Sequence, residues 1–112
     1  MMIIEKHLRV EMPDGSKFDI PVREIAINRA NAFRKEFDNS VIISLLKDTV
    51  PFFENDPAEI FDWASNNMSW EDVADAAVEV PRAEIRSTDY QKGWVNGDKE
   101  IVEPVAMTSP GA

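Results

Sequence analysis

Apolar and polar residues alternate near the start of the chain. Residues 8–12 place an apolar side chain at every second position, and residues 18–22 repeat that period. Such alternation is typical of a strand with one buried face. Pro13-Asp14-Gly15-Ser16 separates the two segments, and each of these residue types suits a tight turn. The pattern predicts an N-terminal β-hairpin, which needs another strand or a helix to cover it.

Helical spacing replaces this alternation at Pro21, because helices tolerate proline only near their start. From Val22 onward, apolar residues fall on one helical stripe, formed by Val22, Ala26, Ala30, Phe33 and Phe37. The spacing predicts a helix over residues 22–37 that ends at Asp38-Asn39.

Three more helical segments are predicted between residues 40 and 80. Ser40 is a candidate N-cap for the first, and Pro51 is expected to kink or split that helix. Asp56-Pro57 followed by Glu59 is a typical start signal for the second of these helices. Ser69 followed by Asp72 is a typical start signal for the third. The third helix is expected to bury Val73, Ala76, Ala77 and Val80 and to stop at Pro81.

The last third of the chain is less regular. Residues 83–86 are expected to form a short strand that joins the hairpin. Asn96-Gly97 is a turn signal, after which residues 99–102 are expected to pair back. Residues 104–112 are expected to be a flexible C-terminal tail.

Together these patterns predict an α+β fold in a single domain over residues 1–103. In this fold an N-terminal β-hairpin, extended by a C-terminal strand, packs against three or four helices.

Composition narrows the class of protein. The 112 residues are 44% hydrophobic and 29% charged, as in ordinary globular domains. The sequence has no cysteine, which excludes disulfides, thiolate metal sites and a cysteine nucleophile. No apolar run approaches the roughly 20 residues of a membrane span, and Glu5-Lys6 come too early for a secretory signal. A cytoplasmic protein with no membrane partner and no cofactor is expected.

Acidic residues are concentrated in the middle of the chain. The formal net charge is −9, and residues 48–80 contain nine Asp and Glu but no Lys or Arg. One interpretation is that these acidic helices simply keep the protein soluble. The other is that they dock a basic partner, such as a nucleic-acid-binding protein, by imitating the spacing of phosphates. Direct binding of nucleic acid is not expected, because this region has no cation to neutralise phosphates.

The second interpretation selects candidate partner-binding carboxylates. In a helix over residues 70–80, Glu71, Asp75 and Glu79 would share one face. The same three side chains could instead hold a divalent cation or act as a paired acid and base, although no calcium-loop motif accompanies them. The candidate carboxylates are Asp62, Glu71, Asp72, Asp75 and Glu79, and no catalytic residue or metal ligand is assigned.

Two further residues each have two interpretations. His7, the only histidine, lies on the polar face of the first strand, where a solvated structural role is favoured over a catalytic one. Trp94 either anchors a partner, as aromatic residues do at binding hot spots, or folds back over the hairpin. Trp94 is kept as the sixth candidate for partner binding.

Two segments resemble a group of viral proteins. One runs from Met12-Pro13-Asp14-Gly15-Ser16 through Ile20-Pro21-Val22 to Ala30, and the other is Glu59-Ile60-Phe61-Asp62-Trp63-Ala64-Ser65-Asn66-Asn67-Met68-Ser69-Trp70-Glu71-Asp72-Val73. Over about residues 8–75, the chain resembles small uncharacterised proteins of tailed bacteriophages, particularly those that infect cyanobacteria. The resemblance implies a viral origin and a role in the infected cell or in the virion. It assigns no catalytic residue.

Three functions therefore remain open. The leading hypothesis is a small, acidic, non-enzymatic module that binds a host or viral protein through residues 48–80. The first alternative is a structural or assembly component of the virion that self-associates, for example as a homodimer, through an exposed hairpin edge. The second alternative is a carboxylate-dependent metal-binding protein or enzyme.

Overall fold

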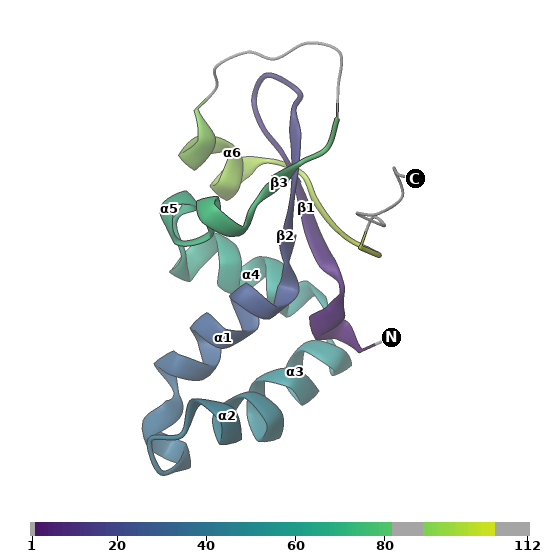
Figure 1. Ribbon diagram of the computed structural model, residues 1–112. Helices are drawn as coiled ribbons and strands as arrows, with labels where there is room; N and C mark the ends of the chain where they lie inside the picture. The colour runs from purple at the N-terminus through teal and green to yellow at the C-terminus, as the bar shows by residue number, and fades with distance from the viewer. Residues whose placement is uncertain (1, 82–88, 105–112) are drawn as a thin grey trace.

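The computed structural model describes residues 2–81 and 89–104 and has the predicted α+β architecture (Figure 1). Its antiparallel sheet has four strands in the order β3-β2-β1-β4. The strands are β1 (His7–Glu11), β2 (Lys17–Pro21), β3 (Val78–Glu79) and β4 (Lys99–Val102). The predicted hairpin of β1 and β2 is confirmed, and so is its extension by a C-terminal strand.

The register of the hairpin explains which face of the sheet is buried. Leu8 lies opposite Ile20 and Val10 opposite Phe18, so their apolar side chains share one face. In the turn, Gly15 has a φ of 89°, a left-handed conformation that glycine adopts at little cost. The Asp14 carboxylate also accepts a hydrogen bond from the Ser16 N–H at 2.9 Å. The turn predicted at Pro13-Asp14-Gly15-Ser16 is therefore confirmed.

Helix α1 (Val22–Ala32) follows β2 directly, and a 3₁₀ turn continues it over Arg34–Phe37. The predicted helix over 22–37 is thus correct in position, although its last turn is tighter than an α-helix. Asp38 and Asn39 have φ values of 55° and 61°. Asp and Asn tolerate this left-handed conformation better than other non-glycine residues, so the chain turns here.

The next helical run is split, as Pro51 predicts. Helix α2 (Val41–Ser44) begins after Ser40, whose hydroxyl accepts a hydrogen bond from the Ile43 N–H at 3.1 Å. A π-helical segment (Leu45–Thr49) then leads into α3 (Val50–Asn55), which has Pro51 in its first turn. Proline lacks an N–H, and its ring crowds the carbonyl group four residues earlier. The wider π turn opens the helix at that carbonyl group, so the helical path continues past Pro51.

Helix α4 (Ala58–Asn67) has the predicted start, because the Asp56 carboxylate accepts a hydrogen bond from the Ala58 N–H at 3.2 Å. Helix α5, however, covers only Trp70–Val73, and a 3₁₀ turn over Ala74–Ala76 follows it. The prediction of one helix reaching residue 80 is wrong. Residues 78–79 instead pair with β2, and the Val80 N–H donates to the Lys17 carbonyl at 2.8 Å. Val78 and Val80 are β-branched, and the free edge of the hairpin offers them strand partners.

The Asn96-Gly97 turn signal is also misleading. Helix α6 covers Tyr90–Asn96, and the Asp89 carboxylate caps it by accepting a hydrogen bond from the Lys92 N–H at 3.0 Å. Residues 99–102 therefore do not fold back on residues 94–95 but pair with β1. The strand predicted at residues 83–86 lies outside the described residues. So does the predicted tail, apart from Pro104.

The core lies between the inner face of the sheet and the helices. An aromatic cluster joins the top of the sheet to α5 and α6: Trp70 stacks on Tyr90, with ring centroids 5.3 Å apart, and Phe18 meets both rings edge-on. Fully buried side chains from the sheet, α3, α4 and α6 complete the core, among them Leu8, Val10, Ile20, Phe53, Ile60 and Trp94. No helix within residues 2–81 and 89–104 is long and apolar enough to cross a membrane.

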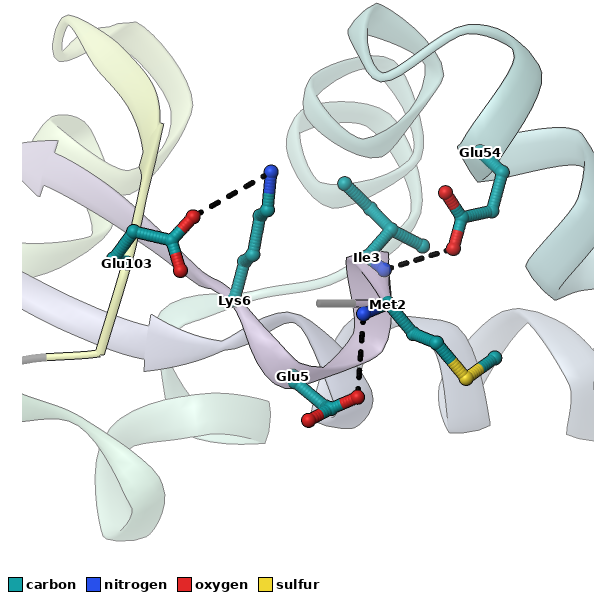
Figure 2. Close-up of polar contacts among 6 residues, drawn as sticks. All are labelled: Met2, Ile3, Glu5, Lys6, Glu54 and Glu103. Carbon is teal, nitrogen blue, oxygen red and sulfur yellow. Dashed lines mark hydrogen bonds and ion pairs between the residues drawn. The ribbon is translucent and has the colours of Figure 1, made fainter.

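Polar contacts fix both ends of the described chain (Figure 2). The Ile3 N–H donates to the Glu54 carboxylate at 2.8 Å, which ties the N-terminal turn to α3. Lys6 Nζ lies 3.6 Å from Glu103 Oε2, which joins the start of β1 to the residue after β4. Glu54 is one of the nine acidic residues in 48–80, and its role here is structural.

Candidate interaction surface

The candidate partner-binding residues do not share one helical face. Glu71, Asp75 and Glu79 belong to three different elements, because the chain changes from α-helix to 3₁₀ turn to strand between them. The predicted i, i+4, i+8 alignment is therefore wrong. By element, Asp62 lies on α4, Glu71 and Asp72 on α5, Asp75 in the 3₁₀ turn, Glu79 on β3 and Trp94 on α6.

Trp94 is a core residue and is not available as a partner anchor. Its side chain is 0% exposed. The indole N–H donates to the carbonyl oxygens of Ala64 at 3.0 Å and Met68 at 3.2 Å, at the C-terminal end of α4. The expectation of an exposed anchor is corrected. The alternative, in which Trp94 folds back over the hairpin, agrees with its burial in one core cluster with the hairpin residues Leu8 and Val10. These two hydrogen bonds satisfy the one polar atom of the indole ring, so the ring can be buried without losing a hydrogen bond to water.

Several of the acidic residues have local structural roles. The Asp72 carboxylate accepts a hydrogen bond from the Ser69 N–H at 2.8 Å, which completes the capping box of α5. The Asp62 carboxylate accepts a hydrogen bond from the Asn66 side-chain amide at 2.9 Å. These donors are neutral, as are those that bind Glu54 and Asp56. Such hydrogen bonds orient the carboxylates, but they bring no cation of residues 2–81 or 89–104 to balance the negative charge.

Asp48 is the exception within the acidic region. Its Oδ2 lies 2.9 Å from Arg29 Nη1, which also donates to the Thr49 hydroxyl at 3.0 Å. The Arg29 guanidinium lies over the rings of Phe52 at 4.4 Å and Phe33 at 4.8 Å. Arg29 therefore links α1 to the π-helical segment and α3. The sequence pattern shows Arg29 only as part of a loose basic stretch, because Asp48 and Thr49, which bond to its guanidinium, lie 19 and 20 residues away.

The other close ion pair lies on the outer face of the sheet. Arg9 and Asp19 stand directly opposite each other in β1 and β2, with Arg9 Nε 2.7 Å from Asp19 Oδ1 and Nη2 3.0 Å from Oδ2. This two-point contact raises the pKa of Arg9, and the nearby Glu100 carboxylate acts in the same direction. The positive charge of Arg9 is thus balanced by the carboxylates of Asp19 and Glu100.

The contrast between these regions defines the candidate surface. Among residues 2–81 and 89–104, ion pairs join Lys6 to Glu103, Arg9 to Asp19, and Arg29 to Asp48. Of the nine carboxylates in residues 48–80, only Asp48 is paired with a cation from this part of the chain. Glu71 and Asp75 are both exposed. We use the name acidic surface for four exposed carboxylates of α4, α5 and the 3₁₀ turn that follows them, namely Asp62, Glu71, Asp72 and Asp75.

A groove borders the acidic surface where α1 faces the junction of α4 and α5. It has a volume of about 310 Å³, and its lining includes Glu24, Ile27, Val41, Met68 and Asp72. Two carboxylates thus lie beside apolar side chains. A long basic side chain suits such a site, because its aliphatic stem covers apolar surface while its charged end meets the carboxylates. Sequence patterns miss this site because Glu24 and Asp72 are far apart along the chain.

The metal-site alternative loses the geometry on which it rested. It required Glu71, Asp75 and Glu79 on one helical face, and they occupy three elements. Nor do three or more His, Asp or Glu side chains of the described segments form a group that could hold a metal ion. His7, the remaining candidate for chemistry, lies in β1 opposite Pro21 and Val102.

Comparison with known proteins finds no matching family model, no matching curated protein and no matching solved structure. The resemblance to proteins of tailed bacteriophages therefore stays a prediction.

Proposed function

We propose that this protein is a non-enzymatic interaction module that binds a basic protein through its acidic surface, with Glu71 and Asp75 as the principal contacts. The supporting observation is that Asp48 alone, of the nine carboxylates in residues 48–80, is ion-paired within the described chain. Uncompensated carboxylates create a negative potential that attracts a cationic surface and speeds its association. A partner would supply the cations that the described residues do not.

The groove beside the acidic surface would bind one basic side chain of the partner specifically, in addition to the general electrostatic attraction. A lysine or arginine of the partner would place its charged end between Glu24 and Asp72 and its stem against Ile27 and Met68. Asp72 is held in place by its bond to the Ser69 N–H, so little side-chain freedom is lost on binding.

The partner class follows from the charge. Proteins that bind nucleic acid carry basic surfaces, and a folded acidic domain would compete with nucleic acid for them. The partner is a host or viral protein, met in the cytoplasm of the infected cell if the chain is phage-encoded. Assembly into the virion is the alternative, with another virion protein as the partner.

Two matched variants test the proposal. Glu71→Gln with Asp75→Asn removes two charges from the acidic surface and leaves the capping residue Asp72 intact. Glu36→Gln with Asp38→Asn removes two charges from exposed residues between α1 and α2, and asparagine tolerates the left-handed backbone at residue 38. Each protein is immobilised and incubated with host lysate at about 50 mM and about 500 mM salt.

We expect the wild type and the control variant to retain the same proteins at low salt, and the Glu71/Asp75 variant to lose them. High salt should release them from the wild type and the control variant as well, because exposed charges are then screened. Equal retention by both double variants, or retention that survives high salt, would contradict the proposal.

A further inference from the structure

We propose that the outer edge of β4 pairs antiparallel with the same edge of a second copy of this chain. The two four-stranded sheets would then form one continuous sheet across a two-fold axis. This interface lies on the strand edge and does not involve the acidic surface, so it is independent of the proposed function.

The register of β4 shows which of its backbone groups are free. The Glu11 N–H donates to the Asp98 carbonyl at 3.0 Å, and Arg9 lies opposite Glu100. In an antiparallel ladder, hydrogen-bonded and non-hydrogen-bonded pairs alternate. Glu100 and Val102 therefore turn their N–H and C=O groups toward β1, whereas Lys99 and Ile101 turn theirs outward.

These outward groups form an open edge. No backbone hydrogen bond within the described parts of the chain uses the N–H or C=O of Lys99 or Ile101 outside the sheet. Pro104 follows the same alternation as Glu100 and Val102, so its missing N–H would face the β1 side and does not interrupt the outer edge. An unpaired edge of this kind is a template for an added strand.

The charges of β4 select a second copy as that strand. An antiparallel pairing centred on Ile101 places Lys99 opposite Glu103 of the second copy, and Glu103 opposite Lys99 of the second copy. Side chains 99, 101 and 103 share one face, so Ile101 meets its own counterpart between the two charge pairs. Opposite charges directly across a sheet stabilise strand pairing, whereas like charges oppose it. The edge is thus complementary to itself.

Glu103 is exposed, and the half-buried Lys99 is not held by a carboxylate of the described residues. The Glu103 side chain is 62% exposed, and Lys6 Nζ lies at the long distance of 3.6 Å from Glu103 Oε2. Figure 2 shows this contact. Lys99 Nζ donates only to the carbonyl oxygens of Gly97 at 3.1 Å and Val95 at 3.3 Å, and no described carboxylate forms an ion pair with it. Each group can therefore accept a partner of opposite charge from the second copy.

The interface is short, so the dimer should be weak. Pairing along one strand buries much less surface than a standard stable interface. Self-association would become significant only at high concentration, as when many copies are gathered at one place.

Reversal of the two charges tests the pairing. Lys99→Glu leaves carboxylates facing each other, and Glu103→Lys leaves ammonium groups facing each other. Each substitution should weaken dimerisation about tenfold. An equimolar mixture of the two variants should restore it, because each then meets its opposite. Sedimentation velocity at up to about 1 mM measures all four samples.

A wild type that stays monomeric at that concentration would overturn the proposal. So would variants that dimerise like the wild type, or a mixture no stronger than its components.

Hydrogen exchange tests the same edge without any substitution. The Ile101 amide should exchange more slowly as the concentration of wild-type protein rises, whereas the Val102 amide, which faces β1, should be protected throughout. A dimer whose Ile101 amide exchanges at an unchanged rate would place the interface elsewhere and refute the pairing. This measurement decides the matter even if a charge variant fails to fold.

Discussion

The buried side chain of Trp94 caps the C-terminal end of α4. Its indole N–H bonds to the carbonyl oxygens of Ala64 and Met68, groups at the end of α4 that lack a donor within the helix. We expect Trp94→Phe to lower the free energy of unfolding by about 2 kcal/mol, because it leaves a small cavity and unsatisfied carbonyls. Urea denaturation measures this loss. Trp63→Phe is the control, since Trp63 is only half-buried and donates to Asn28; an equal loss in both variants would contradict the account.

Gly97 lies where two segments of main chain meet. A Cβ atom there would fall against the carbonyl oxygen of Glu11 and within 2.5 Å of the Gly93 oxygen. Neither main-chain atom can swing aside as a flexible side chain could, so Gly97→Ala should cost about 2 kcal/mol or more. The exposed neighbour Asn96 provides the comparison, because Asn96→Ala should change stability by less than about 0.5 kcal/mol. Thermal unfolding of the two variants should separate them clearly.

Lys99 makes stability depend on pH. Burial lowers the pKa of its ammonium group from the usual 10.5. As the pH rises between the folded pKa and 10.5, the unfolded chain holds this proton while the folded chain has released it, so stability rises with pH. Relative to Lys99→Met, the wild type should therefore become more stable from neutral pH toward 10.5 when both are unfolded in dilute solution. A difference that stays constant across this range would contradict the assignment.

At the scale of elements, the sequence predicts structure where the signals are local. The hairpin turn, the Ser40 cap and the Asp56 cap each depend on residues within three positions of one another. Residues 78–79 follow a helical pattern yet form a strand, because their partner in β2 lies about sixty residues earlier. Likewise, Asn96-Gly97 is a hairpin signal in the sequence alone. In the structure, however, residues 99–102 pair with β1 and not with the residues just before Asn96. Long-range pairing overrides local preference in both places.

Arg29 shows how one side chain fastens helices together. Its guanidinium bonds to Asp48 and Thr49 and lies over two aromatic rings, so its planar shape and its charge both matter. Arg29→Lys should lower stability by about 1–2 kcal/mol, since an ammonium group cannot reproduce the stacked geometry. Arg23→Lys, at an exposed position of the same helix, should have almost no effect. Similar midpoints of chemical denaturation for the two variants would show that Arg29 does not link the helices.

Across the whole molecule, the sequence shows that acidic residues are distributed unevenly along the chain. It does not show which of their carboxylates are ion-paired. Counting alone places nine carboxylates in residues 48–80. The fold then pairs Asp48 with Arg29, bonds Glu54 to the distant Ile3 N–H, and uses Asp56 in a local hydrogen bond at the start of α4. It also brings Glu24, from outside that region, beside Asp72. Apart from the local cap at Asp56, these divisions depend on tertiary contacts, so no spacing rule could supply them.

We propose that the acidic surface gathers negative potential and attracts cations. Titration of ¹⁵N-labelled protein with a short oligolysine peptide, followed by amide chemical shifts, locates the residues that a cation approaches. We expect the largest shift changes at Glu71 and Asp75, further changes at Glu24 and Asp72 where a lysine side chain enters the groove, and smaller ones at Asp62, all of them suppressed by salt. Changes at Glu36 and Asp38 that match those at Glu71 and Asp75 would contradict the account.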